Sequence, residues 1–382
     1  MTELDALLIL NSIPGLGNIR KRKLIDHLGS AAKFFCLNAA QLSQLKNTNI
    51  LPPKVLNDIQ NFPKDIYLKK EYNFVQSHGV CLLTYQDEDY PERLKKIPDH
   101  PLVLYIKGDS KKLRYPAIAM VGSRHASIYG LLMAEKFSVQ LAESGLTIVS
   151  GMARGIDTAS HRGALKAKGT TIAVLGCGLC HVYPKENKKL AEEIAKSGAV
   201  VSEFSMETPV LPCHFPQRNR IVSGLSLGVV VVEASQKSGA LITSDFALEQ
   251  GREVFAIPGK IDQPNSQGVN RLIKEGAKLV CCVEDILEEL KGDLQTYLKE
   301  AHDWDKEKQK SDDRTQNIFE GLTPEEELIC RTLSNLPYHI DDLAQQLNFS
   351  VARLMGFLLK LELKGRVRRL PGQLFVRKDL SI

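Results

Sequence analysis

The stretch Ala117-Ile118-Ala119-Met120-Val121-Gly122-Ser123-Arg124 sets the architecture of the chain. A short apolar run that ends at glycine is typical of a strand buried on both faces. The same order of apolar run, glycine and helical pattern recurs along the chain. We expect strands at Ala117–Val121, Leu146–Val149, Thr171–Leu175, Val200–Phe204, Val229–Glu233 and Val254–Ile257. These βαβ units predict an α/β fold, in which helices cover both faces of a parallel sheet.

Glycine-rich loops follow several of these strands. Right-handed crossovers bring all strand-to-helix loops to one edge of the sheet, so we expect the loops to meet there. Each loop precedes a helix N-terminus, whose free amides and partial positive charge attract anions. The loops span residues 122–124, 150–155, 176–185 and 235–239, and the nearby cations are Arg124, Arg154, Lys185, Arg218 and Arg220. Phosphate is therefore the predicted ligand.

Six motifs along the chain resemble the DNA-processing protein A (DprA/Smf) family. They are Val121–Arg124, Ser150–Asp157, Tyr183–Asn187, Phe215–Arg220, Ser238–Thr243 and Arg252–Gly259, and the resemblance covers about residues 86–283. It implies a Rossmann-like domain that binds single-stranded DNA without catalysis and forms a homodimer. It further implies that the protein protects DNA entering the cell in natural transformation and loads a RecA-type recombinase onto it.

The resemblance also implies which residues contact DNA. Arg124 and Lys185 are the expected phosphate contacts, and the Arg218–Arg220 segment is expected to border the same pocket. The predicted DNA-binding set is Gly122, Ser123, Arg124, Lys185, Arg218, Asn219 and Arg220. Phe215 and Tyr183 flank the basic positions, where they either stack on bases or pack into the core.

The segment Cys177-Gly178-Leu179-Cys180-His181 matches the covalent haem motif. We expect no haem, because haem attachment belongs to oxidising compartments and no export signal is evident. A zinc site with Cys213 or His214 would rest on a single C-x-x-C pair, so we predict no metal and no cofactor. Cys180 replaces the aspartate that the family usually carries, which removes a carboxylate from this loop.

The alternative function is a nucleotide-processing Rossmann-like enzyme of the lysine-decarboxylase-like group. Asp157 and His161 lie four residues apart near Ser150, a spacing that suits a hydrolase site or, equally, helix capping and packing. Enzymes of that group carry a Pro-Gly-Gly-x-Gly-Thr phosphate loop, whereas residues 234–239 read Ala-Ser-Gln-Lys-Ser-Gly. No dinucleotide fingerprint or Walker A sequence is present either. We therefore expect no enzymatic activity.

Residues 1–85 predict a small N-terminal domain of short helices, with helical spacing in Leu4–Leu10, Ile19–Leu28 and Val55–Ile66. Ile13-Pro14-Gly15-Leu16-Gly17, followed by four basic residues, resembles a helix-hairpin-helix element that could approach a phosphate. An interhelical turn in a protein-interaction bundle of the sterile-alpha-motif (SAM) kind explains the same residues.

Residues 284–320 are acidic and polar and predict a linker, which separates the central domain (86–283) from a winged helix at 321–382. In the winged helix we expect three helices, the first opened by Thr323 and Glu326, and a β-hairpin around Pro371-Gly372. Cations on the third helix and the hairpin suit duplex DNA, whereas many winged helices bind protein. A transcription factor that acts through this domain is a third hypothesis.

The net charge of +5 over 382 residues is unevenly distributed. Residues 111–270 carry +5, residues 271–320 carry −4 and residues 351–382 carry +6, which places the excess of cations in the central domain and the C-terminal tail. No apolar run reaches the about 18 to 20 residues that span a bilayer, and the first residues are acidic where a secretory signal is basic. We therefore expect a cytoplasmic protein with no membrane contact.

Overall fold

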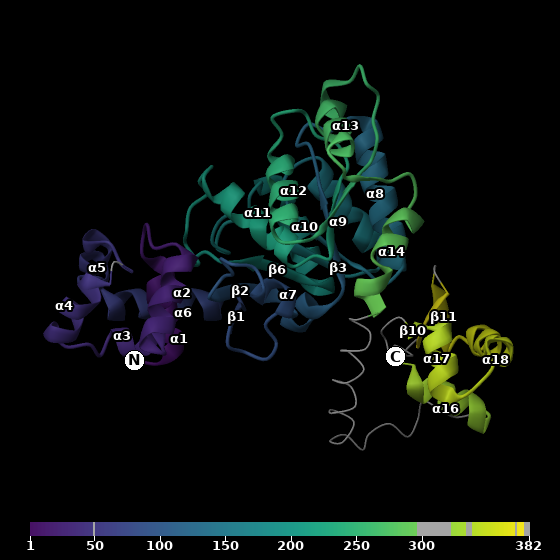
Figure 1. Cartoon of the computed structure of the whole chain (residues 1–382), viewed down its shortest axis with the longest axis horizontal. Coiled ribbons are helices and arrows are strands. Elements are labelled where there is room, and N and C mark those ends of the chain that lie inside the picture. Colours follow the sequence, from purple (N-terminus) through teal and green to yellow (C-terminus); the bar gives the residue numbers. More distant parts are fainter. Residues whose placement is uncertain (49, 296–321, 334–337, 371–372, 378–382) are drawn as a thin grey trace. The chain divides into compact units, whose positions relative to one another are not determined.

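The computed structural model describes residues 1–48, 50–295, 322–333, 338–370 and 373–377 (Figure 1). The chain forms two compact units. One comprises Met1–Val139 with Thr147–Leu279, and the other comprises Gln140–Leu146 with Val280–Ile382. Within the described residues, no helix is both long enough and apolar enough to cross a bilayer.

The N-terminal helices are α1 (Glu3–Ser12), α2 (Asn18–Leu28), α3 (Ala31–Phe34), α4 (Ala39–Asn47), α5 (Pro53–Gln60) and α6 (Lys64–Ser77). A capping box formed by Thr2 and Asp5 opens α1. Proline interrupts the apolar pattern predicted over 55–66, so this region forms the end of α5 and the start of α6. The predicted helical character of this region is confirmed.

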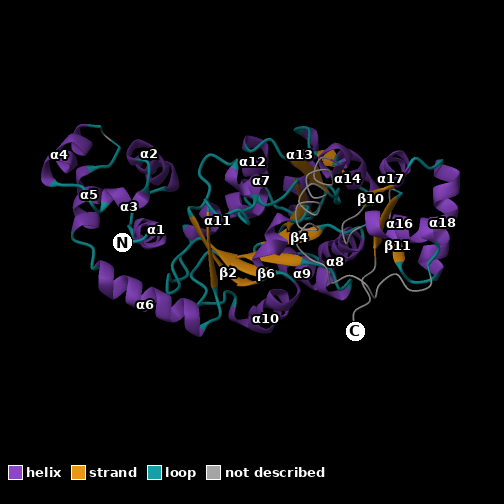
Figure 2. Cartoon of the chain, turned by 90° about the horizontal axis from the view of Figure 1, so that it is seen from below, coloured by secondary structure: helices purple, strands orange, loops and turns teal. Residues whose placement is uncertain are grey.

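A nine-stranded sheet forms the centre of the first unit (Figure 2). The strands are β1 (Cys81–Thr84), β2 (Val103–Gly108), β3 (Ala117–Val121), β4 (Thr147–Ser150), β5 (Thr171–Val174), β6 (Ala199–Ser202), β7 (Gly228–Val231), β8 (Glu253–Ala256) and β9 (Lys278–Leu279). Their order across the sheet is β1-β2-β6-β5-β4-β3-β7-β8-β9. All six predicted strands are present, and the predicted α/β class is confirmed.

The sheet is parallel from β6 to β9, but β2 pairs antiparallel with β6 and β1 pairs antiparallel with β2. The six predicted strands are thus parallel, as expected, and the antiparallel edge consists of β1 and β2, which the sequence pattern does not predict. β1 lies among the residues assigned to the N-terminal domain, yet it extends the central sheet. The β1–β2 pair was missed because it lacks the strand, glycine and helix sequence that marks a βαβ unit.

Helices cover both faces of the sheet, as its strands predict. They are α7 (Glu92–Lys95), α8 (Ile128–Glu143), α9 (Ile156–Lys166), α10 (Lys188–Ser197), α11 (His214–Gly224), α12 (Gly239–Glu249) and α13 (Gln267–Lys274). Figure 2 shows α10 on one side of the strands and α12 on the other. All residues of β3, β4 and β5 are buried, which explains their uninterrupted apolar runs.

The C-terminal domain contains α16 (Pro324–Thr332), α17 (Ile340–Leu347) and α18 (Val351–Leu363), with strands β10 (Tyr338–His339), β11 (Val367–Leu370) and β12 (Leu374–Arg377). This is the predicted winged helix, and the capping box of Thr323 and Glu326 opens its first helix. The first residues of the predicted linker instead form the helix α14 (Glu284–Glu289), in which Ile286 is buried. The remainder of that linker from residue 296 and the Pro371-Gly372 turn lie outside the described residues.

Candidate nucleic-acid interface at the edge of the sheet

The loop after β3 is held rigidly at the edge of the sheet. The Ser123 amide donates to the carbonyl of Glu233 at 2.7 Å, and the Ile156 amide donates to the carbonyl of Ser123 at 3.2 Å. Gly155, at φ +74°, packs against the Ser123 carbonyl so closely that a side chain would not fit. These contacts join three loops and leave the Arg124 side chain exposed to solvent.

Arg124 lies over Phe215, which forms with Tyr183 an aromatic pair that we call the aromatic platform. The guanidinium carbon of Arg124 is 5.2 Å from the centroid of the Phe215 ring. The rings of Tyr183 and Phe215 have centroids 5.7 Å apart, and 42% of Tyr183 is exposed. The site therefore combines a cation with an accessible aromatic face, which is the pair of features that single-strand binders use.

Lys185 lies in the same loop as Tyr183, at the start of a short 3₁₀ helix that ends at Asn187. Asn187 is buried and ties this loop to its neighbours, because its amide donates to the Met152 carbonyl at 2.9 Å and to Thr158 Oγ1 at 2.8 Å. Lys185 itself is exposed. Among the described residues, neither Arg124 nor Lys185 has an ion-pair partner.

Arg154 is exposed but already paired. Its Nε donates to the Glu186 carboxylate, and this contact raises the pKa of Arg154 and lowers the pKa of Glu186. Because the carboxylate offsets its charge, Arg154 contributes less to an anion site than its position in the sequence indicates.

Arg218 lies inside the domain. It is 4% exposed, and its Nη1 donates to the Gly151 carbonyl at 2.5 Å and to the Val174 carbonyl. Burial lowers the pKa of Arg218, which the nearby Asp157 carboxylate counteracts, and burial raises the pKa of Asp157. Arg218 thus stabilises the carboxyl ends of β4 and β5 from the interior of the domain, through hydrogen bonds to their carbonyl groups.

The neighbouring residues are also engaged within the protein. Asn219 is half-buried, and its amide donates to the Gly239 carbonyl at 3.3 Å. Arg220 is 5% exposed, and it pairs with Asp99 at 3.0 Å and with Glu203. Of the predicted DNA-binding set, the structure thus exposes Arg124 and Lys185, leaves Gly122 and Ser123 half-buried, and places both Arg218 and Arg220 in the interior. Direct DNA contacts by these two arginines stay a prediction.

The residues considered for catalysis are buried, and each makes a hydrogen bond within the protein, although Nε2 of His161 has no partner among the described residues. Ser150 Oγ donates to the Met120 carbonyl at 2.6 Å, and Asp157 accepts from the Ala153 amide at 3.1 Å. His161 Nδ1 lies 2.7 Å from Thr171 Oγ1. These contacts are of the kind found in helix capping and packing, and the absence of catalysis stays a prediction.

The cysteine motif has no geometry for a metal. Over the described part of the chain, no three His, Cys, Asp or Glu side chains gather closely enough to hold an ion. Cys177 is buried, and burial raises the pKa of its thiol to about 11.

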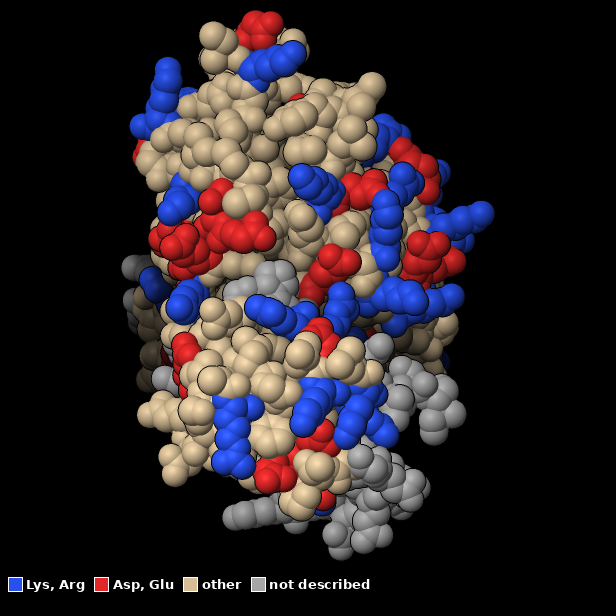
Figure 3. Space-filling view, turned by 90° about the vertical axis from the view of Figure 1, so that its right-hand side faces the viewer, with Lys and Arg blue, Asp and Glu red and all other residues tan. Residues whose placement is uncertain are grey.

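Some of the cations in the winged helix contact other groups of the same domain. Lys364 donates to Glu326 at 2.6 Å, and the Arg353 guanidinium lies 5.2 Å from the Phe349 ring. Arg368 and Arg369 remain exposed on β11. Because some cations of this domain are engaged internally and others are exposed, its charges do not by themselves distinguish duplex DNA from protein as its partner. On the face of the whole chain drawn in Figure 3, basic and acidic side chains are interspersed rather than gathered by sign.

Glu233 is an anchor of the site that sequence reasoning missed. Its buried carboxylate accepts hydrogen bonds from the Ser127 amide at 2.9 Å and from the Ser127 hydroxyl, which holds the loop between Arg124 and α8. The only signal in the sequence is an acidic residue at the end of the apolar run 229–233.

Comparison with known proteins agrees with this arrangement. Residues 81–291 match the family model of DNA recombination-mediator protein A, and residues 315–373 match the DprA winged helix domain. The chain is 40% identical over 299 residues to Protein Smf of Escherichia coli, covering 76% of each chain. It is 42% identical over 256 residues to DNA processing protein DprA of Bacillus subtilis, covering 66% of this chain and 85% of that one.

Two solved structures show the same fold. DNA processing protein A of Streptococcus pneumoniae superposes with a TM-score of 0.65 at 38% identity, over 76% of this chain and 98% of that one. The Helicobacter pylori protein, whose structure describes its single-stranded DNA binding mode, superposes with a TM-score of 0.51 at 30% identity, over 56% of this chain and 96% of that one. The chain belongs to the DNA recombination-mediator protein A family, also known as DprA or Smf.

Proposed function

We propose that this protein binds single-stranded DNA at the Arg124 site, protects DNA that enters the cell in natural transformation, and loads a RecA-type recombinase onto it. The observation that carries the DNA-binding step is the exposed Arg124 at the aromatic platform, which has no ion-pair partner in the described part of the chain, with Lys185 in the adjoining loop. The cations suit the phosphates of a single strand, and the rings offer its bases a surface for stacking. The related H. pylori protein supports the choice of ligand.

The handover to a recombinase and a homodimeric state belong to the same proposal and rest on family membership. Under this proposal the protein binds DNA without catalysing a reaction. It acts in the cytoplasm. Incubation with common nucleoside phosphates, followed by product chromatography, is expected to show no conversion; turnover would favour the nucleotide-processing alternative.

The decisive experiment measures the affinity of the full chain for a short oligo-dT by fluorescence anisotropy. Arg124→Ala and Lys185→Ala should each weaken binding by about 10- to 100-fold, because each removes a charge-assisted hydrogen bond to a phosphate. Arg162→Ala and Lys196→Ala are the matched controls, since Arg162 is an exposed cation on α9 and Lys196 is an exposed cation in the last turn of α10, away from the site. Wild-type affinity in folded Arg124→Ala and Lys185→Ala variants would refute the site.

The salt dependence of the same binding reaction gives a second test. For single strands, log K falls with log salt concentration by about 0.7 for each neutralised phosphate. Arg124→Ala should therefore reduce this slope by about 0.7, whereas Arg162→Ala should leave it unchanged. An unaltered slope in Arg124→Ala would show that Arg124 contacts no phosphate.

A further inference from the structure

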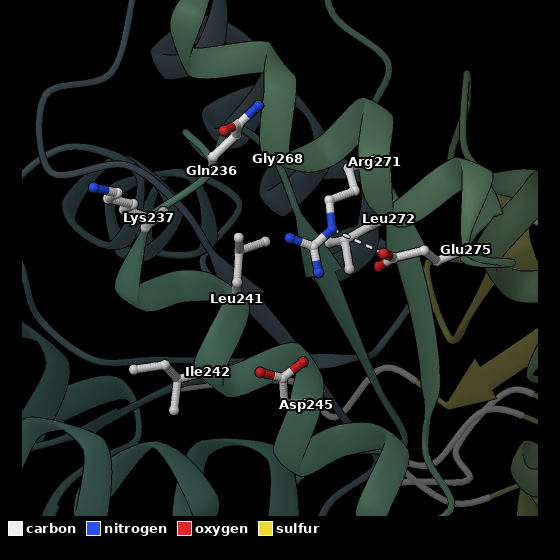
Figure 4. A pocket seen from close by; sticks show the side chains of 10 residues that line it. Gln236, Lys237, Leu241, Ile242, Asp245, Gly268, Arg271, Leu272 and Glu275 are labelled. Atoms are coloured by element: carbon white, nitrogen blue, oxygen red, sulfur yellow. Dashed lines mark hydrogen bonds and ion pairs between the residues drawn. The ribbon is translucent and has the colours of Figure 1, made fainter.

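A groove of about 820 Å³ lies where the N-terminal helices meet the sheet domain. One wall is the turn Ile13–Gly17 between α1 and α2, and the other is the chain from the end of β6 to the first turn of α11. Its volume is within the range of small-ligand sites. A smaller cavity of about 270 Å³ lies near α12 and α13, and the paired Arg271 and Glu275 are among its lining residues (Figure 4). We call the larger one the junction groove.

The junction groove has an aromatic wall next to the proposed DNA site. The rings of Phe204 and His214 stack with centroids 4.3 Å apart and planes 25° from parallel. His214 directly precedes Phe215 of the aromatic platform. Two consecutive residues of α11 therefore direct their rings to different partners, His214 to Phe204 and Phe215 to Tyr183. The aromatic wall of the junction groove and the aromatic platform are therefore connected through adjacent residues of α11.

The polar groups of the groove have unused hydrogen-bonding capacity. Arg220 is 5% exposed and lines the groove, yet its Nη1 has no hydrogen-bond partner among the described residues. The same holds for Nδ1 of His214. Gln217 adds an exposed amide to the rim. A buried guanidinium nitrogen without an acceptor is costly, so a ligand acceptor that Arg220 reaches by a small side-chain adjustment is favoured.

The charges of the groove favour an uncharged ligand. Its cations are Lys21 and Arg220, and its anions are Asp99 and Glu203, which pair with Arg220. A phosphate would lie beside two carboxylates that already offset these cations. A nucleobase instead carries no charge, offers carbonyl and ring-nitrogen acceptors to Arg220 and Gln217, and presents a flat face to the aromatic wall.

We propose that the junction groove binds one base of the single strand whose neighbouring nucleotides cross the Arg124 site. The inference rests on the proposed function and adds to it a second base site, formed by the sheet domain and the N-terminal helices together. The base stacks on an outer face of the His214–Phe204 pair, and Arg220 and Gln217 bond its edge.

An abasic scan of the DNA tests this site in the full chain. A fluorescent oligonucleotide of about 12 residues is prepared with one abasic position at a time, and each affinity is measured by anisotropy with wild type and variants. In wild type, one position beyond the platform should lose about 5- to 100-fold in affinity, the range found for a stacked base. In the His214→Ala and Gln217→Ala variants, the abasic change at that position should reduce affinity clearly less than in wild type. The reason is that these variants already lack a contact between the groove and the base.

Gln76→Ala provides the matched control, since this exposed helical glutamine lies outside the groove and should leave the whole scan as in wild type. Arg124→Ala separates the two proposals. If Arg124→Ala weakens binding but no abasic effect depends on His214 or Gln217, the groove is refuted and the DNA-binding function stands. If the wild type binds no oligonucleotide, or Arg124→Ala binds normally, the proposed DNA site fails and the inference fails with it.

Competition with free deoxyadenosine monophosphate tests whether the groove binds a base of a DNA strand or a free nucleotide. Under the proposal, the free nucleotide competes weakly with the oligonucleotide, and the Gln217→Ala variant loses that competition. Saturable binding of the nucleotide that depends on Gln217 but leaves oligonucleotide affinity unchanged would show that the groove serves free nucleotides, which overturns the proposal.

Discussion

Arg124 and Arg218 are both arginines of family motifs at the same edge of the sheet, but burial separates their roles. Arg124 is exposed over an aromatic ring, whereas Arg218 fills the space that a side chain on Gly151 would occupy. The carbonyls of tight loops need donors when they are buried, and Arg218 supplies them. Charge in a motif therefore identifies the region of a site, and burial decides which cation meets the ligand.

Replacement of Arg218 should affect stability before it affects DNA. Arg218→Met leaves two carbonyls and the buried Asp157 without their cationic partner, and we expect the free energy of unfolding to fall by about 3 to 5 kcal/mol. Arg124→Met should change it by less than about 0.5 kcal/mol, because its side chain is exposed. Urea unfolding curves of both variants provide the measurement. Equal stability of the two would contradict the structural role of Arg218.

His161 makes the fold sensitive to acid. Burial, with a smaller contribution from Arg218, lowers its pKa to about 3, compared with about 6.5 in the unfolded chain. Between these values the unfolded chain binds a proton that the folded chain does not, so stability is complete above pH 6.5 and falls as the pH decreases toward 3. The expected loss approaches about 1.4 kcal/mol per pH unit.

The control for this effect is His161→Gln, which keeps a polar group near Thr171 but does not titrate. Unfolding free energies of wild type and variant, measured from pH 7 to pH 4, should converge as the pH falls. Parallel curves would show that His161 does not contribute to the acid sensitivity.

At the scale of elements, βαβ periodicity identified every strand from β3 to β8, because these strands are buried on both faces and end in glycine or polar loops. β1 and β9 carry exposed residues, and β2 joins the sheet antiparallel, so none of them gives that signal. The site was predicted only in part. Arg124 and Lys185 follow directly from their loops, whereas the partners of Arg220 come from residues 99 and 203, whose proximity is set by tertiary packing.

The pairing of β2 with β6 depends on close backbone contact at Gly108. Its φ is +119°, and a Cβ there would lie 2.8 Å from the Ala195 carbonyl oxygen. Gly276 has a similar φ of +109° but open space around it. Gly108→Ala should therefore destabilise the protein by about 1 to 3 kcal/mol more than Gly276→Ala. Denaturant unfolding measures this difference, and equal effects would mean that only the backbone angle matters.

At the scale of the whole chain, the core that joins the N-terminal helices to the sheet is distinct from the core of the winged helix among the described residues. The core of the first unit runs without interruption from N-terminal helices into the sheet, including Leu7 and Tyr105. Tyr67 reinforces this junction through a hydrogen bond of 2.9 Å to Ser205. The winged helix has a separate core, which includes Ile329 and Leu358. The N-terminal helices and the sheet are therefore expected to unfold together, and the winged helix independently.

Truncation tests this division. A chain that ends at residue 291 should keep the thermal transition of the first unit within a few degrees of the full chain. A chain that starts at residue 81 should lose much of its stability or aggregate, because it exposes core residues of the sheet. Calorimetry of both fragments checks the prediction. A stable, monodisperse fragment starting at residue 81 would contradict the shared core.

The charged contacts across this junction also predict which residues are conserved together among related proteins. Glu203 belongs to the sheet domain, yet it accepts from Asn18 at 3.1 Å and from Arg220, and it is the main charge that counteracts the burial of Lys21. In a relative that lacks the N-terminal helices, Glu203 would have neither Asn18 nor Lys21 beside it. Asn18, Lys21 and Glu203 are therefore expected to be gained and lost as a set among relatives, whereas Arg124 is expected to persist in both kinds of chain.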